Sequence, residues 1–115
     1  MAGRSSYALE KLSLAVHYLA VGPGDVRQRL KTAYMEFHVV SEDDFPEHLR
    51  DDWQWIIAQL IRFGPVRHAD GTIFVGALEN TLSRIKNSTG AKIAERIVSL
   101  QAELESYLED DRSSH

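Results

Sequence analysis

The chain has 115 residues, a formal net charge of -4 and no cysteine, with 43% hydrophobic and 26% charged residues. This length and composition suit one globular domain, and the absence of cysteine excludes disulfides, thiolate metal sites and a cysteine nucleophile. No apolar run reaches the ~18 residues of a membrane span, and the N-terminus lacks the apolar core of a signal peptide. We therefore expect a single cytoplasmic domain of bacterial type over residues 1–115, with residues 1–5 and 110–115 disordered or frayed.

Charge alternates in blocks along the chain. Residues 41–62 and 99–115 each carry a net charge of -4, whereas residues 1–40 and 63–98 each carry +2. Such blocks indicate helices that complement one another, either within the domain or across a subunit contact.

The first helix is predicted from about residue 7 to residue 21. Ser6 can cap its first turn, and Gly22-Pro23 ends it because glycine adopts the left-handed conformation easily and proline cannot continue a helix. The apolar residues that form its buried face recur at steps of three and four: Leu9, Leu12, Val16 and Leu19.

The second helix is predicted to begin after Asp25, which forms a capping-box pattern with Gln28 three residues later. It should extend to about residue 40, because Val26, Leu30, Ala33, Phe37 and Val40 keep the helical spacing. The hydroxyl and acids of residues 41–44 then predict a single helical turn before Pro46.

The third helix should begin near Pro46 and end at Gly64-Pro65. Its apolar stripe comprises Leu49, Trp53, Ile56, Leu60 and Phe63, and Ile57 and Ile61 widen it. So wide a face usually contacts two neighbours, which predicts that this helix is central.

Residues 66–75 are the least regular segment. Asp70-Gly71 fits the type I′ turn of a short hairpin. The alternative, which we favour, is that Thr72 caps a further helix, because the apolar spacing from Leu78 continues without a break to residue 107.

That spacing predicts one long helix over residues 73–109, kinked at Gly90, with two helices meeting near Ser88 as the alternative. The sequence thus predicts an all-α bundle of four main helices with a long C-terminal helix. A compact monomer leaves the end of such a helix uncovered, so we expect a homodimer. The predicted dimer contacts are Ile97, Leu100, Leu104 and Tyr107.

Few residues have the spacing of a metal or catalytic site. The five histidines include no pair at i and i+4, and the acids of residues 43–52 do not follow the order of a calcium loop. Nucleotide-binding glycine patterns and the Gly-x-Ser-x-Gly motif are missing too. We therefore predict no metal, no cofactor and no catalytic residue from motifs.

Arg62 and His68 are separated by five residues, which resembles the Arg-x(4–6)-His spacing of the HEPN ribonucleases, a family of helical bundles that cleave RNA. The resemblance implies a catalytic pair that works across a dimer. Phe63-Gly64-Pro65 departs from the family pattern, because it removes the two residues from a common helix.

A basic stripe is predicted on the long helix, because Arg84, Ser88, Lys92 and Arg96 follow at steps of four. Like charges on one face oppose helix formation, so acids of the third helix, of a second subunit or of an external partner should compensate. The predicted partner-binding residues are Arg84, Asn87, Ser88, Lys92 and Arg96. We expect a non-catalytic adaptor or regulatory protein that acts through protein contacts with an acidic partner. The alternative is an RNA- or DNA-acting protein, including a HEPN-like ribonuclease.

Overall fold

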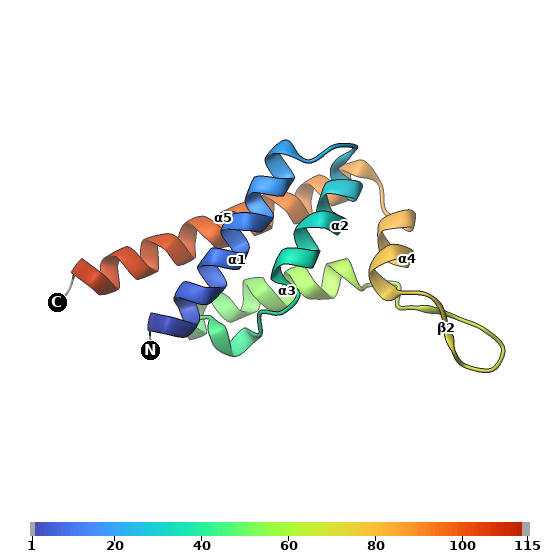
Figure 1. Cartoon of the computed structure of the whole chain (residues 1–115), viewed down its shortest axis with the longest axis horizontal. Helices are drawn as coiled ribbons and strands as arrows, with labels where there is room; N and C mark the ends of the chain where they lie inside the picture. Colours follow the sequence, from blue (N-terminus) through green and yellow to red (C-terminus); the bar gives the residue numbers. More distant parts are fainter. Residues whose placement is uncertain (1, 114–115) are drawn as a thin grey trace.

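A computed structural model describes residues 2–113, which form five α-helices, two 3-10 turns and one two-stranded hairpin (Figure 1). The elements are α1 Ala2–Val21, α2 Val26–Phe37, η1 Glu42–Asp44, η2 Glu47–Leu49, α3 Arg50–Leu60, β1 Val66–Arg67, β2 Ile73–Val75, α4 Ala77–Arg84 and α5 Asn87–Ser113. The all-α class is confirmed. The arrangement differs from four main helices because the predicted C-terminal helix is divided in two.

Helix α1 begins at Ala2, five residues before the predicted start. Two contacts to η1 hold its first turns: Ser5 Oγ donates to the Asp44 carbonyl at 3.0 Å, and Arg4 Nε donates to the Asp44 carboxylate at 3.0 Å. Residues 2–5 and 110–113, which we expected to be frayed, are thus helical, whereas Met1 and residues 114–115 lie outside the described part of the chain.

The connection between α1 and α2 has the predicted ends, but the conformation of Gly22 differs from the prediction. Helix α1 ends before Gly22, where a Cβ atom would lie 2.5 Å from the Tyr18 carbonyl oxygen, so steric space rather than a left-handed backbone requires this glycine. The left-handed residue is Gly24, with φ 85°. Asp25 and Gln28 form the predicted capping box.

The hydrophobic core lies among α1, α2, α3 and α5, and α5 contacts the other three. Helix α5 packs against α1, α2 and α3, whereas α3, among the α-helices, packs mainly against α5 and α4, so the prediction that the third helix, from Pro46 to Gly64, is central is wrong. The aromatic part of the core is a cluster in which the Trp53 ring lies 5.5 Å from Phe37 and 5.0 Å from Phe45, between ring centroids. The aliphatic part follows α5 from Ile93 to Leu108.

Residues 66–75 form the hairpin, not the beginning of a helix (Figure 1). The Gly71 amide donates to the His68 carbonyl, so Ala69 and Asp70 are the central residues of the turn and Gly71, with φ 90°, follows it. The turn therefore differs from the predicted type I′ turn centred on Asp70-Gly71, and it leaves a bulge between Val66 and Arg67.

The predicted long helix is interrupted at Ile85, whose backbone is extended with ψ 157°. In a continuous helix the Ile85 carbonyl would accept a hydrogen bond from the amide four residues later. Here it accepts one from Nη1 of Arg27 at 3.3 Å, while its side chain stays buried. The alternative of two helices is therefore correct, with the junction at residues 85–86. Gly90 lies within α5, beyond this junction.

Candidate partner-binding surface at the hairpin end

The break at Ile85 divides the predicted partner-binding residues. Arg84 ends α4, while Asn87, Ser88, Lys92 and Arg96 belong to α5. The five residues therefore do not form a single helical stripe, and each group has different neighbours.

Arg96 is held by residues of α3. Its Nη1 donates to Asp52 at 2.9 Å, and its guanidinium carbon lies 4.4 Å from the centroid of the Trp55 ring. The acidic third helix thus compensates this cation within the chain, which is one of the compensating contacts that the sequence predicted. Lys92, Glu95 and Ser99 line a hollow of about 290 Å³ beside this pair.

Three of the four predicted dimer contacts lie inside the chain. Ile97, Leu100 and Leu104 are at most 1% exposed, because α1, α2 and α3 cover this side of α5. Tyr107 is 37% exposed. The apolar seam is therefore core, and it gives no support to a homodimer formed through these leucines.

Arg84 takes part in a different arrangement, a cluster that we call the hairpin-end surface and define as Arg62, Phe63 and Arg84. The guanidinium carbons of Arg62 and Arg84 lie 5.3 and 5.7 Å from the centroid of the Phe63 ring. Phe63 is 44% exposed although it is fully apolar. An exposed aromatic ring close to two guanidinium groups is typical of recognition surfaces.

Two buried polar side chains of α4 fix the backbone of this cluster. Thr81 Oγ1 accepts a hydrogen bond from the Phe63 amide at 3.1 Å, and Asn80 Nδ2 donates to the Gly64 carbonyl at 2.9 Å. Gly64 can follow this path because its φ is 66°. The segment that ends α3 is therefore held rigidly while Phe63 points outward.

The side-chain amide of Asn80 also orients Arg84. Nε of Arg84 donates to Asn80 Oδ1 at 3.0 Å, so one buried residue contacts both the turn and the cation. Only the Nε–H is used in this bond, and a guanidinium has four further N–H groups that can bind an acidic ligand.

The sequence missed this surface because Phe63 fits the apolar spacing of the third helix and was assigned to its buried face. Helix α3 ends at Leu60, and residues 61–63 form turns, so both Ile61 and Phe63 leave the core side. The Gly64-Pro65 pair indicates this helix end in the sequence, because a left-handed glycine commonly follows the last turn of a helix.

Arg62 and His68, the pair that resembles the HEPN spacing, lie on different elements. Arg62 follows the end of α3 beside Phe63, and His68 follows β1, where its amide donates to the Thr72 carbonyl at 2.7 Å. The described residues therefore do not place this pair on a common helix.

Three of the six acids in residues 42–52 bind groups of the chain itself. Asp44 pairs with Arg4, Asp52 pairs with Arg96, and Glu42 accepts a hydrogen bond from Gln54. Within residues 2–113, no group of three His, Asp or Glu side chains is placed to hold a metal ion.

Three carboxyl groups at the surface have a pKa below the ordinary value: Asp25, Asp70 and Glu79. In the hairpin, the hydrogen bond from the Thr72 hydroxyl, at 2.7 Å, lowers the pKa of Asp70. The charged Asp70 carboxylate thus accepts hydrogen bonds from Thr72 that hold the turn of the hairpin.

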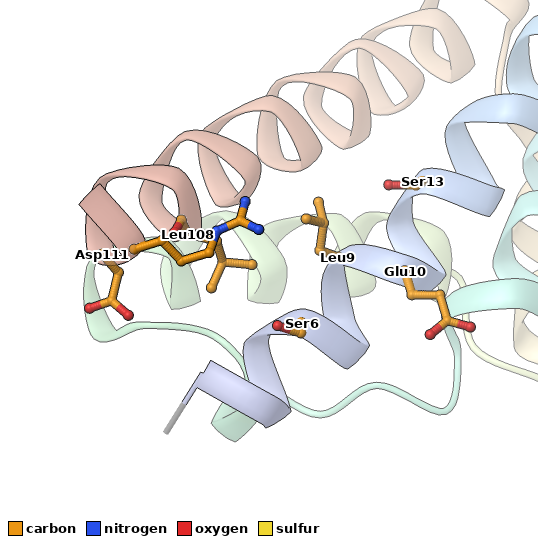
Figure 2. A pocket seen from close by; sticks show the side chains of 7 residues that line it. Ser6, Leu9, Glu10, Ser13, Leu108 and Asp111 are labelled. Atoms are coloured by element: carbon orange, nitrogen blue, oxygen red, sulfur yellow. Dashed lines mark hydrogen bonds between the residues drawn. The ribbon is translucent and has the colours of Figure 1, made fainter. Parts of the chain in front are cut away.

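A second hollow, of about 320 Å³, lies between α1 and α5 at the other end of the molecule. Figure 2 shows Ser6, Leu9 and Ser13 of α1 on one side, and Leu108 and Asp111 of α5 on the other. Leu108 is buried and Leu9 is half-buried, whereas the polar groups lie around them. The arrangement is an apolar groove without the charged and aromatic cluster of the hairpin end.

No protein-family model, curated protein or solved structure matches the chain. None of the described helices combines the length and the apolar character required to cross a membrane.

Proposed function

We propose that the protein is a non-catalytic cytoplasmic adaptor that binds an acidic segment of a partner protein through the hairpin-end surface. The observation that carries this proposal is the exposed Phe63 ring close to the guanidinium groups of both Arg62 and Arg84.

The composition of the surface supports a protein partner. Aromatic residues and arginine are enriched at the centres of protein interfaces, where they contribute most of the binding free energy. Ile61, in the turn after α3, and Ile73, in β2, are 41% and 57% exposed and add aliphatic area. Aliphatic side chains suit a peptide partner better than the polar backbone of a nucleic acid.

Rigidity supports the same proposal. Asn80 and Thr81 hold the backbone at residues 63–64 before any partner binds. A surface that is already ordered loses less conformational entropy on binding, so more of the contact energy contributes to affinity.

The acidic character of the partner follows from charge. Arg62 and Arg84 make no ion pair with an acidic residue in the described part of the chain. Carboxylates of a partner can form bidentate hydrogen bonds with such guanidinium groups.

The test is photo-crosslinking in cells of the organism that encodes the protein. A photoreactive phenylalanine analogue replaces Phe63, and a matched control places it at Met35, which is 59% exposed on α2. We expect one partner to be crosslinked from position 63, through an acidic peptide, and to be lost when Arg62→Glu is added. Equal capture from both positions, or capture that survives Arg62→Glu, would contradict the proposal.

Single-stranded nucleic acid is the second candidate, because an exposed aromatic ring close to cations also suits base stacking beside a phosphate backbone. Fluorescence anisotropy with labelled RNA and DNA oligonucleotides tests it. Binding that weakens with salt and is lost in Phe63→Ala would favour this candidate over a protein partner. RNA cleavage that requires both Arg62 and His68 would assign the ribonuclease activity.

A further inference from the structure

Helix α5 carries an exposed polar stripe on a side that does not face the core. Six residues recur at steps of four and three, which places them on one side of the helix. We call them the α5 stripe: Lys92, Arg96, Ser99, Glu103, Ser106 and Asp110. The stripe is positive at its beginning and negative at its end, and the two serines lie between the charged positions.

The surface beside the stripe is hollowed on the α3 side. Lys92, Arg96 and Ser99 line one hollow together with Trp55, and Glu103, Ser106 and Asp110 line another together with Tyr107. Both aromatic side chains are partly exposed. The stripe therefore lies beside a surface that is recessed, with aromatic area available in each half.

Most charges of the stripe have no counter-ion among the described residues. Arg96 pairs with Asp52, but Lys92, Glu103 and Asp110 form no ion pair within residues 2–113. The fold also brings together segments of like charge, since His48 and Asp52 of one acidic block line a hollow with Glu103 and Asp110 of the other. The expected pairing of acidic with basic blocks is thus only partly met inside one molecule.

We propose that a second copy of the chain supplies counter-ions for Lys92 and Asp110 by packing its α5 stripe antiparallel against the first. With the midpoint at residue 101, Lys92 of each copy faces Asp110 of the other, and Ser99 faces Glu103. The dimer then has two equivalent Lys92–Asp110 pairs, which lie about 27 Å apart along the helix at 1.5 Å per residue.

Two features favour the antiparallel direction. A parallel pair would place lysine against lysine and aspartate against aspartate, which is repulsive. The antiparallel pair has two-fold symmetry, so both copies use the same patch and the assembly closes as a dimer. In this register Glu95, the remaining charge of the first hollow, faces Tyr107 of the second copy, whose hydroxyl can donate to it.

This inference uses a different surface from the proposed function, and either can fail alone. It also replaces the dimer contacts expected from the sequence, because those leucines are in the core. The interface is polar, so dimerisation should weaken as the salt concentration is raised. The effect should be clear at physiological ionic strength, where the Debye length is about 8 Å.

The experiment is sedimentation equilibrium of the purified chain at low ionic strength with single charge reversals. The wild type should be a dimer of two 13.0 kDa chains, whereas K92E and D110K should each weaken dimerisation roughly tenfold or more by opposing like charges twice. Neither reversal opposes the helix dipole, since K92E adds an acid towards the N-terminus and D110K adds a base towards the C-terminus. K86E, at an exposed position outside the stripe, is the matched control and should leave dimerisation unchanged.

Mixing the two variants provides the decisive arm. In a K92E:D110K heterodimer both charge pairs are again opposite in sign, so dimers should return on mixing. The K92E/D110K double variant restores the same opposite charges within a homodimer and should also dimerise. A wild type that is monomeric at low salt, or reversals that are not rescued by mixing, would overturn the proposal. An equal loss with K86E would overturn it too, because the effect would be one of total charge.

A distance measurement tests the direction independently. The chain has no cysteine, so Ser88→Cys can carry a single spin label on the exposed first turn of α5. The antiparallel arrangement predicts a label separation of about 40 Å, since residue 88 lies 13 positions from the midpoint in each copy. A separation near 10 Å would indicate a parallel pair and refute the inference.

Discussion

Asn80 donates a hydrogen bond from its buried side-chain amide to the carbonyl of Gly64 at 2.9 Å. A residue in the first turns of α4 therefore determines how the chain leaves α3, and with it the position of Phe63. This contact connects the stability of the fold to the geometry of the proposed binding surface.

Removing that amide should destabilise the protein. Asn80→Ala leaves the Gly64 carbonyl without its donor, and we expect the free energy of unfolding to fall by about 1–3 kcal/mol, measured by urea denaturation. Asn87→Ala, at an exposed position in α5, is the control and should change it by less than about 0.5 kcal/mol. A similarly small effect of Asn80→Ala would mean that the turn is held by other contacts.

Leu104 should contribute to the stability of the monomer rather than to association. Its side chain is 0% exposed, so Leu104→Ala should cost about 2–5 kcal/mol through lost transfer energy and the cavity that remains. Val98→Ala, at a 43% exposed position in the same helix, is the matched control. If Leu104→Ala instead produced a stable monomer from a dimer, the assignment of this seam to the core would be wrong.

Gly90 is required for close approach of α5 to α2. A Cβ atom at this position would lie 3.0 Å from Val26 Cγ1 and 3.5 Å from Leu30 Cδ1. Gly90→Leu should therefore destabilise the fold by about 1–3 kcal/mol through overpacking. Val26→Ala should recover part of this loss in the double variant, and thermal unfolding of the four proteins measures the coupling. Additive effects would show that the two side chains do not meet.

The cap of α2 should make stability depend on pH. The hydrogen bond from the Arg27 side chain, followed by that from the Gln28 amide, lowers the pKa of Asp25 below its ordinary value of 3.8. A carboxyl whose pKa is lower in the folded state stabilises that state above the unfolded pKa, and this contribution is lost as pH falls through the folded pKa.

The melting temperatures of the wild type and Asp25→Ala should therefore converge as pH decreases from 7 towards 2. Asp25→Asn keeps a capping side chain that does not titrate, so its difference from Asp25→Ala should stay nearly constant over this range. If the difference in melting temperature between the wild type and Asp25→Ala is also constant, the predicted dependence of stability on pH is contradicted.

Local signals in the sequence determined the elements whose ends are set by neighbouring residues. Asp25 and Gln28 cap α2 as predicted, and residues 41–44 form the single turn, because both features depend on side chains that reach backbone amides within three residues. The spacing of Leu49, Trp53, Ile56 and Leu60 likewise identified buried positions, since burial on one side of a helix imposes that period.

Tertiary contacts decided the features that carry the proposals. The apolar spacing continued through Ile85 because α4 and α5 both pack on the core, yet Arg27 of α2 takes the Ile85 carbonyl and the helix breaks there. Phe63 fits the buried period by spacing alone, but α3 ends first, α4 holds the backbone amide of Phe63, and the side chain is 44% exposed. The seam of Leu100 and Leu104 reads equally as a dimer contact or as core, and only the positions of the other helices decide that it is core. A periodic pattern states which residues need cover, and the packing of the whole chain determines what covers them.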